Sequence, residues 1–150
     1  MAQPALSEVF STRLQKGGAL ISDMRSIVTA WTDGLEKGDP VSVISRTLPK
    51  ATPARLKDTY IRAFKPRFLN GSPPQAWKIL RVLEDASADF QVLRAFYYWI
   101  TARAELPLYG FVVEIILPMQ RSGRFDIRVE DAVAWLGDKT KEAGLAWTPT

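Results

Sequence analysis

Apolar residues recur at intervals of three and four along most of the chain, which is the period of an amphipathic α-helix. The most apolar stretch covers residues 87–119, and its apolar positions surround most of the helix circumference. Pro107 divides it, so we predict two helices, the second ending before Pro118. Because a helix that is apolar nearly all round is normally buried, we expect these two helices to form a central hairpin.

The two helices of this hairpin have different patterns. In the first, Phe96, Tyr98 and Trp99 widen an already apolar face. In the second, Glu114 lies opposite a face of five apolar residues: Leu108, Phe111, Val112, Ile115 and Ile116. This second segment, Leu106–Met119, is shorter than the roughly 20 apolar residues that a bilayer span requires, so we expect a buried core helix.

Shorter helices are predicted on either side of the hairpin. Residues 20–35 have a clean amphipathic pattern, and residues 129–136 form a final short helix. Asp39-Pro40 and Thr52-Pro53 each combine a capping side chain with a proline in the first helical turn, so a helix should begin at each pair.

Three further signals concern helix boundaries. Ser72 and Gln75 have the spacing of a capping box, which predicts a helix start at this point. Ser87 is expected to cap the central hairpin. Pro66 should kink or end the preceding helix near Phe64, because proline lacks the backbone N–H that a helix interior uses.

These patterns predict an all-α protein, a compact bundle of about six to seven helices around the central hairpin. The length of 150 residues favours a single domain, 1–150. Residues 1–12 are expected to form a loose arm and residues 138–150 a polar tail. Thr148–Thr150 has the pattern of a helix start, so we expect that the natural protein, or at least its relatives, continues beyond this point.

The chain contains no cysteine and no histidine. This composition excludes zinc sites of the usual Cys/His kind, Ser-His-Asp and Cys-His nucleophiles, and imidazole bases. The absence of cysteine fits a reducing compartment. Residues 1–10 also lack the basic and apolar regions of a secretory signal, so we expect a cytoplasmic protein.

Carboxylates are the remaining catalytic candidates, and they form two clusters: Glu84, Asp85 and Asp89, and Glu130 and Asp131. We expect these acids to be solvated residues at helix ends. No acid is followed two residues later by lysine, as in many metal-dependent nucleases, and no phosphate-binding glycine loop occurs. We therefore expect no enzymatic activity, no metal and no cofactor, and keep a carboxylate-metal nuclease as a remote alternative.

Positive charge is concentrated in one segment. Residues 46–67 contain seven basic residues and one acid, whereas the rest of the chain has thirteen basic and fifteen acidic residues. Lysine and arginine contacts to phosphates give affinity that depends on salt. We predict that this segment binds nucleic acid through phosphates, using Arg46, Lys50, Arg55, Lys57, Arg62, Lys65 and Arg67. Lys16, beside Gly17 and Gly18 at a helix start, is a further candidate.

Other interpretations of the basic segment stay open. It is alternatively a solvated helix face, and Tyr60, Phe64 and Phe68 have a helical spacing that favours core positions over stacking platforms. Three more arginines would extend the patch if the fold brings them near: Arg121, Arg124 and Arg128. The competing function is a protein-interaction module that docks through aromatic side chains, with an affinity nearly independent of salt.

Several stretches together resemble the BrxA family of the BREX bacteriophage-exclusion systems, small helical proteins formerly labelled putative inner-membrane proteins. The similarity rests on their order and spacing over residues 10–136: Lys16–Arg25 with Trp31, Arg67-Phe68, Phe96–Trp99, Phe111–Pro118, and Val129–Asp131 leading to Trp135-Leu136. The resemblance implies an all-helical fold similar to the NusB-type antiterminator fold. It also implies a protein that binds DNA, double-stranded DNA being expected, and acts in phage defence beside a methyltransferase and other BREX proteins. It identifies no contact residues.

Overall fold

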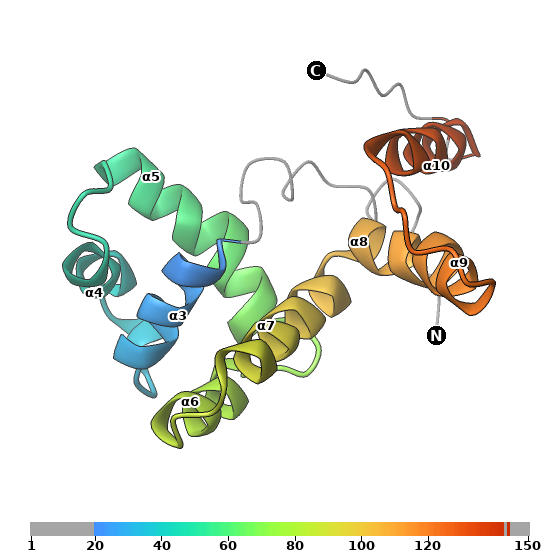
Figure 1. Cartoon of the computed structure of the whole chain (residues 1–150). Coiled ribbons are helices and arrows are strands. Elements are labelled where there is room, and N and C mark those ends of the chain that lie inside the picture. The colour runs from blue at the N-terminus through green and yellow to red at the C-terminus, as the bar shows by residue number, and fades with distance from the viewer. Residues whose placement is uncertain (1–19, 143, 145–150) are drawn as a thin grey trace. The chain divides into compact units, whose positions relative to one another are not determined.

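The computed structural model describes residues 20–142 and Gly144 (Figure 1). All regular secondary structure in these residues is helical, and none of them lies in a strand. The prediction of an all-α fold is therefore confirmed. The N-terminal arm, Lys16 and the helix start at Thr148–Thr150 lie outside the described residues.

Backbone contacts divide the chain into two compact units, with a boundary between Ala104 and Glu105. The larger unit contains the described residues 20–104, and the smaller unit contains 105–142 and Gly144. The two helices that were predicted to pair as a central hairpin belong to different units. Each unit has its own internal packing.

The larger unit consists of α3 (Ile21–Ala30), the 3-10 helix η1 (Leu35–Lys37), α4 (Pro40–Thr47), α5 (Pro53–Asp58), the π-helix η2 (Thr59–Leu69), α6 (Trp77–Asp85) and α7 (Phe90–Ala104). Within it, α3 packs against α4, α6 and α7 (Figure 1). η2 continues directly from α5 and packs against α7 and α4. α7 therefore contacts α3, α6 and η2.

The core of this unit is a chain of aromatic rings. The ring centroids of Trp31 and Phe64 lie 4.6 Å apart, those of Phe64 and Phe68 5.6 Å, and those of Phe68 and Tyr97 5.9 Å. Tyr60 stacks on Trp31 at 6.0 Å, and all five side chains are buried. The expectation that Tyr60, Phe64 and Phe68 are core residues is confirmed.

Two of the predicted helix starts are confirmed. The Asp39 carboxylate accepts a hydrogen bond from the Ser42 N–H at 3.1 Å, and the Thr52 hydroxyl accepts one from the Arg55 N–H at 3.3 Å. A proline is the first residue of each helix that follows, α4 and α5. Its missing N–H costs nothing there, because first-turn N–H groups have no partner within the helix.

Two other predicted boundaries are wrong. α6 begins at Trp77, after the predicted capping box of Ser72 and Gln75, because Gln75 has a φ of 56° that a right-handed helix does not allow. Ser87 also has a positive φ, 51°, and does not cap α7. Asp89 does so instead, since its carboxylate accepts the backbone N–H two residues further on at 2.8 Å.

The smaller unit consists of α8 (Leu106–Phe111), the π-helix η3 (Val112–Ile116), α9 (Leu117–Arg121) and α10 (Val129–Glu142). The first three are consecutive, and α10 packs against α8. α10 begins at the predicted residue but extends beyond the predicted end at Leu136. The Phe111 and Trp135 rings lie 5.7 Å apart at the contact between α8 and α10.

Neither internal proline ends its helix. Of the two outcomes predicted for Pro66, a kink or an end near Phe64, the end is therefore wrong, and so is the predicted end before Pro118. The first helix continues past Pro66 to Leu69 in π-helical form. Hydrogen bonds in a π-helix run to the fifth residue back, so the carbonyl four residues back is not held against the proline ring as in an α-helix. Pro118 is the second residue of α9, directly after η3, so π-helical bonding precedes this proline too.

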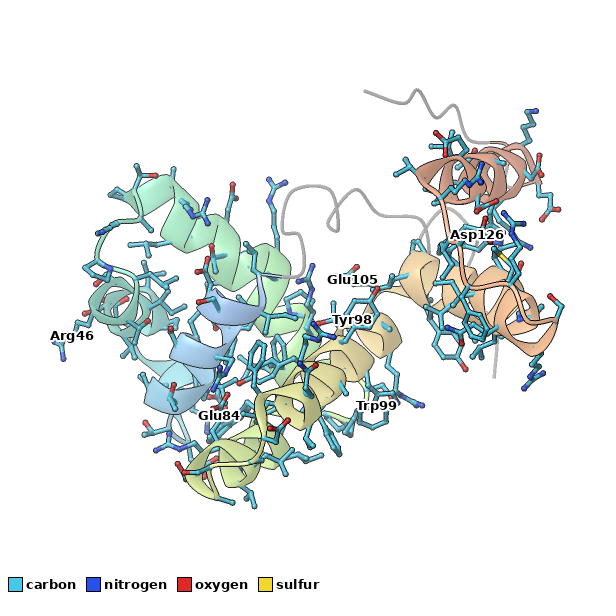
Figure 2. The ribbon with its side chains drawn as sticks, in the orientation of Figure 1. Arg46, Glu84, Tyr98, Trp99, Glu105 and Asp126 are labelled. Carbon is cyan, nitrogen blue, oxygen red and sulfur yellow. The ribbon has the colours of Figure 1, made fainter. Side chains whose placement is uncertain are left out.

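The stretch predicted to be central is largely exposed. No residue of α8, η3 or α9 is buried, so the buried core helix expected at Leu106–Met119 is wrong. Phe96, Tyr98 and Trp99 of α7 are exposed as well. Figure 2 labels Tyr98 and Trp99 on this helix. The physical reason is that neighbouring helices of each unit cover one face of these helices only. Among the described residues, no helix is both long and apolar enough to cross a bilayer.

Candidate nucleic-acid interface

The predicted basic residues lie on three successive parts of the larger unit. Arg46 is in the last turn of α4 and extends outward from it, and Lys50 follows that helix (Figure 2). The remaining five lie on α5 and η2: Arg55, Lys57, Arg62, Lys65 and Arg67. α4 packs against both α5 and η2, so the fold brings these parts together.

The helix formed by α5 and η2 is amphipathic, so its core residues and its exposed lysines lie on opposite sides. Leu56, Tyr60 and Phe64 are buried on one side. Lys57 and Lys65, eight residues apart, are exposed on the other. Because residues four apart lie on one face of a helix, these two lysines share a solvent-facing surface. The local sequence thus presents charge outward by the same periodicity that buries its aromatic rings.

Four of the basic residues have no ion pair with any described residue: Arg46, Lys50, Lys57 and Lys65. All four are exposed. Their charge is therefore not offset by a bound carboxylate within the part of the chain that the structure describes. An exposed cation of this kind is suited to a phosphate, because no internal contact has to be broken first.

Two other cations are paired with acids. Arg55 Nη2 lies 3.3 Å from Asp23 Oδ2 on α3, and Arg62 Nε lies 3.1 Å from Asp58 Oδ1 one turn before it. Both pairs are substantially exposed, so each contributes little to stability. Their effect on the candidate interface is electrostatic: each acid lowers the positive potential that a phosphate would meet.

Arg67 does not belong to the interface. Its side chain is fully buried, and no solvent-exposed face of η2 includes it. The sequence held a signal for this, because Arg67 lies three residues after Phe64 and so falls on the aromatic side of the helix. The prediction selected Arg67 by its charge alone. We therefore remove Arg67 from the set of expected phosphate contacts.

A hollow of about 490 Å³ adjoins the basic residues at the junction of α3, α4 and α5. Its lining includes cations, an acid and apolar side chains: Asp23, Thr47, Leu48, Pro49, Lys50, Ala51 and Arg55. Lys50 and Arg55 are thus two predicted residues that the structure brings to one site. Asp23, from a helix distant in sequence, was not predicted there, since sequence spacing gives no information on contacts between helices.

The three arginines that might have extended the patch lie in the smaller unit. Arg124 Nε is 3.1 Å from Asp126 Oδ1 and its Nη2 is 3.5 Å from Asp131 Oδ2, and Arg128 pairs with Asp126 at 3.4 Å. Arg121 has no ion pair with a described residue. The described part of this unit has five basic and seven acidic residues, against thirteen basic and eight acidic in the larger unit. Positive charge therefore belongs to the larger unit.

The first acidic cluster is only partly what the sequence predicted. Asp85 pairs with Arg81 at the surface and Asp89 caps α7, as expected of helix-end acids. Glu84 instead is largely buried, and its carboxylate oxygens accept hydrogen bonds from Arg25 at 2.8 and 2.9 Å and from the Tyr97 hydroxyl at 3.1 Å. The expectation of a solvated Glu84 is wrong because helix α6 turns this residue toward α3 and α7.

These contacts give Glu84 a structural function. The hydrogen bonds from Arg25 lower the pKa of Glu84, and they outweigh the opposing effect of burial. Burial and the nearby carboxylate raise the pKa of Tyr97. The hydrogen bonds of Glu84 join helices α3, α6 and α7. Because its pKa is lowered, the Glu84 carboxylate is ionised at neutral pH. Among the described residues, no three acids are grouped so that they could hold a metal ion.

The sequence prediction also missed the exposure of aromatic side chains on α7. Phe96 and Trp99 are three residues apart and their rings meet edge to face at 6.3 Å. The guanidinium of Arg103 lies over the Trp99 ring, 5.6 Å from its centroid. A signal for this surface existed in the sequence, because the apolar residues of α7 cover more of its circumference than one buried face requires.

Comparison with curated proteins and with solved structures gives no match. Similarity to the NusB-type fold therefore stays a prediction. Residues 8–150, nearly the whole chain, match the sequence model of the BrxA family. On this match, the chain belongs to the BrxA family.

Proposed function

We propose that this chain is a non-catalytic component of a BREX phage-defence system that binds double-stranded DNA through its phosphates. Membership of the BrxA family supports the role in phage defence. The observation that carries the DNA proposal is the group of four exposed cations without an ion pair to a described residue: Arg46, Lys50, Lys57 and Lys65. They lie on α4, on the turn that follows it and on the helix formed by α5 and η2, all in the unit that holds the excess of positive charge.

The remaining cations of the segment have a secondary role in this proposal. Arg55 and Arg62 would exchange a carboxylate for a phosphate, so their net contribution is smaller than that of the four exposed cations. Asp23 and Asp58 weaken binding, because each places a negative charge beside the expected path of the DNA backbone. Contacts of this kind position a duplex and carry little base specificity.

Salt dependence is the first test. Binding of a fluorescent DNA duplex is measured by anisotropy between about 50 and 200 mM KCl, over which phosphate-led binding falls steeply. Four phosphate contacts predict that the logarithm of the association constant falls with the logarithm of salt concentration with a slope of about −3 to −4. A slope near zero would contradict phosphate-led binding.

A matched pair of variants locates the surface. Lys57→Glu with Lys65→Glu should weaken duplex binding by at least about tenfold and reduce the salt slope, since two phosphate contacts become repulsive. The control, Arg121→Glu with Lys141→Glu, changes the net charge equally at exposed positions of the smaller unit. Equal weakening by both pairs would show a response to net charge alone. Greater weakening by the control would place the DNA surface on the smaller unit.

Neutralising the acid at the hollow gives a test with the opposite sign. Asp23→Asn removes a negative charge and frees Arg55, so duplex affinity should rise by about two- to fivefold at low salt. Asp33→Asn is the matched control, because Asp33 pairs with Lys78 elsewhere on the same unit. Unchanged affinity in Asp23→Asn would remove Arg55 and the hollow from the interface.

The second candidate function is a protein-interaction module that docks other defence components. The exposed Phe96, Tyr98 and Trp99 of α7 favour it, because aromatic residues and arginine are enriched where protein interfaces hold most of their binding energy. Docking through apolar side chains would be nearly indifferent to salt. A folded chain that binds no duplex at low salt would favour this function over DNA binding.

A further inference from the structure

Ile61 is an exposed apolar side chain on the helix formed by α5 and η2, which lies along one side of the larger unit (Figure 1). The side chain is 49% exposed, although its neighbour Tyr60 is buried and belongs to the core. Ile61 takes no part in the core that the described residues form. Contact with a partner that removes this apolar surface from water would be favourable.

Two lysines bracket Ile61 on the outer face of the helix. Lys57 precedes it by four residues and Lys65 follows it by four, so the three side chains share one solvent-facing side. Both lysines are exposed, and neither has an ion pair with a described residue. Single apolar residues on a protein surface are common and need no partner. What distinguishes Ile61 is its place between two cations that are available to phosphates.

Ile79 of α6 shows the difference. It is 41% exposed on the same unit, but the residues four before it and four after it are uncharged. The cations beside it in sequence, Lys78 and Arg81, are paired with carboxylates at 2.6 and 2.9 Å. Of these two exposed isoleucines, Ile61 is therefore the one that a duplex bound by lysines would contact.

The width of the helix indicates which groove of the duplex it enters. A helix with its side chains is about 10–12 Å across, which fits the major groove of about 12 Å and exceeds the minor groove of about 6 Å. With the lysine face turned inward, the residue at its middle, Ile61, meets the base edges. The long lysine side chains on either side can extend to the phosphates that border the groove. The acid nearest to this face, Asp58, is held by Arg62 at 3.1 Å.

The chemistry of the major groove then determines what Ile61 contacts. The apolar group that a base pair presents there is the C5-methyl group of thymine. We propose that Ile61 contacts thymine methyl groups in the major groove and gives this chain a modest preference for duplexes that contain them. The inference rests on the proposed DNA binding. It adds a base contact to phosphate contacts that carry no sequence information by themselves.

The experiment compares two duplexes that differ only in methyl groups. One is a short duplex made of A·T pairs, and the other has uracil in place of every thymine. Binding of the full chain is measured by fluorescence anisotropy at low salt. The phosphates are the same in both duplexes, so phosphate contacts alone give equal affinities. We expect the thymine duplex to bind about three- to fivefold more tightly, the gain from burying one methyl group.

Three variants locate the contact. Ile61→Ala should bind the two duplexes equally, while its salt slope stays that of the wild type, because both lysines remain. Ile61→Val keeps a branched apolar side chain and should retain most of the preference. The matched control is Ile79→Ala, which should leave the preference unchanged. Both positions are substantially exposed, so the variants should fold, which circular dichroism checks.

The outcomes separate this inference from the DNA binding on which it rests. Equal binding of the two duplexes by the wild type, with the salt slope retained, would exclude the methyl contact and leave the phosphate contacts in place. A thymine preference that persists in Ile61→Ala, or that is lost in Ile79→Ala, would place the contact on another side chain. A folded chain that binds neither duplex at low salt would overturn the proposed DNA binding and this inference with it.

Discussion

The two units of this protein bury their apolar residues to very different extents. The larger unit encloses aromatic rings from η2, from α7 and from Trp31, which directly follows α3, in a continuous core. In the smaller unit Trp135 is the only large apolar side chain in α8, η3, α9 and α10 that is buried. Its helices are no less apolar in sequence, so composition does not explain the difference. The number of helices available to cover each apolar face does.

The units also use their charges differently. In the larger unit, the pair of Arg25 with Glu84 is partly buried and joins α3 to α6, while four exposed cations have no carboxylate partner among the described residues. In the smaller unit, Arg124 and Arg128 are matched with Asp126 and Asp131. The first arrangement leaves a field that attracts polyanions, and the second cancels its own field. We therefore place the proposed phosphate contacts on the larger unit.

The largest predicted effect compares core truncations in the two units. Phe64→Ala should destabilise the larger unit by about 3–5 kcal/mol, because the ring is fully buried between Trp31 and Phe68. Phe111→Ala, which removes a half-buried ring from the smaller unit, should cost about 1–2 kcal/mol. Urea denaturation, monitored by amide hydrogen exchange, measures the free energy of unfolding of each unit separately. Equal losses would mean that the smaller unit is as tightly packed as the larger.

The second prediction concerns the bridge between α3, α6 and α7. Glu84→Gln should destabilise the larger unit by about 2–3 kcal/mol, because Arg25 loses its ionised partner and Tyr97 loses its charged acceptor. Asp85→Gln removes an acid one residue away whose pair with Arg81 is exposed, and should have little effect. Similar losses of stability in the two variants would show that the buried position of Glu84 adds nothing to the strength of its ion pair.

The third prediction uses two glycines of the smaller unit. A Cβ at Gly110 would lie 2.9 Å from the Trp135 side chain, so Gly110→Ala should force the indole to move and cost about 1–3 kcal/mol. Gly137 lies in α10 with no atom near the added methyl group, so Gly137→Ala should stabilise by about 0.5–1 kcal/mol. Thermal unfolding measures the stability of both variants, and tryptophan fluorescence reports a change around the indole. The same sign for the two variants would show that α8 does not approach Trp135 closely.

The smallest effect is a dependence on pH. Because the folded-state pKa of Glu84 is lowered, its stabilisation is present above the pKa of the unfolded chain, about 4.3, and is lost as the pH falls through the folded-state value. The larger unit should therefore weaken below pH 4.5 or so, and this loss should be shallower in Glu84→Gln. Urea midpoints between about pH 3 and pH 7 measure the difference. Parallel pH profiles for the two proteins would exclude Glu84 as the group responsible.

The sequence by itself determined the helical class, because a period of three to four residues is a local property of each segment. It determined the starts of α4 and α5, where the Asp39 and Thr52 side chains each accept the backbone N–H three residues further on. It also determined which faces of α5 and η2 carry aromatic rings and which carry lysines. These features depend only on interactions within one or two turns of the chain.

Tertiary structure alone decided which apolar faces are covered and which charges are paired. The sequence placed the stretch around Trp99 and Tyr109 at the centre, yet both side chains are exposed, because burial depends on helices distant in sequence. The same reason explains why Asp23 of α3 reaches Arg55 of α5. Periodicity shows that a helix has an apolar side. Only the arrangement of its neighbours decides whether that side forms a core or remains a surface for a partner.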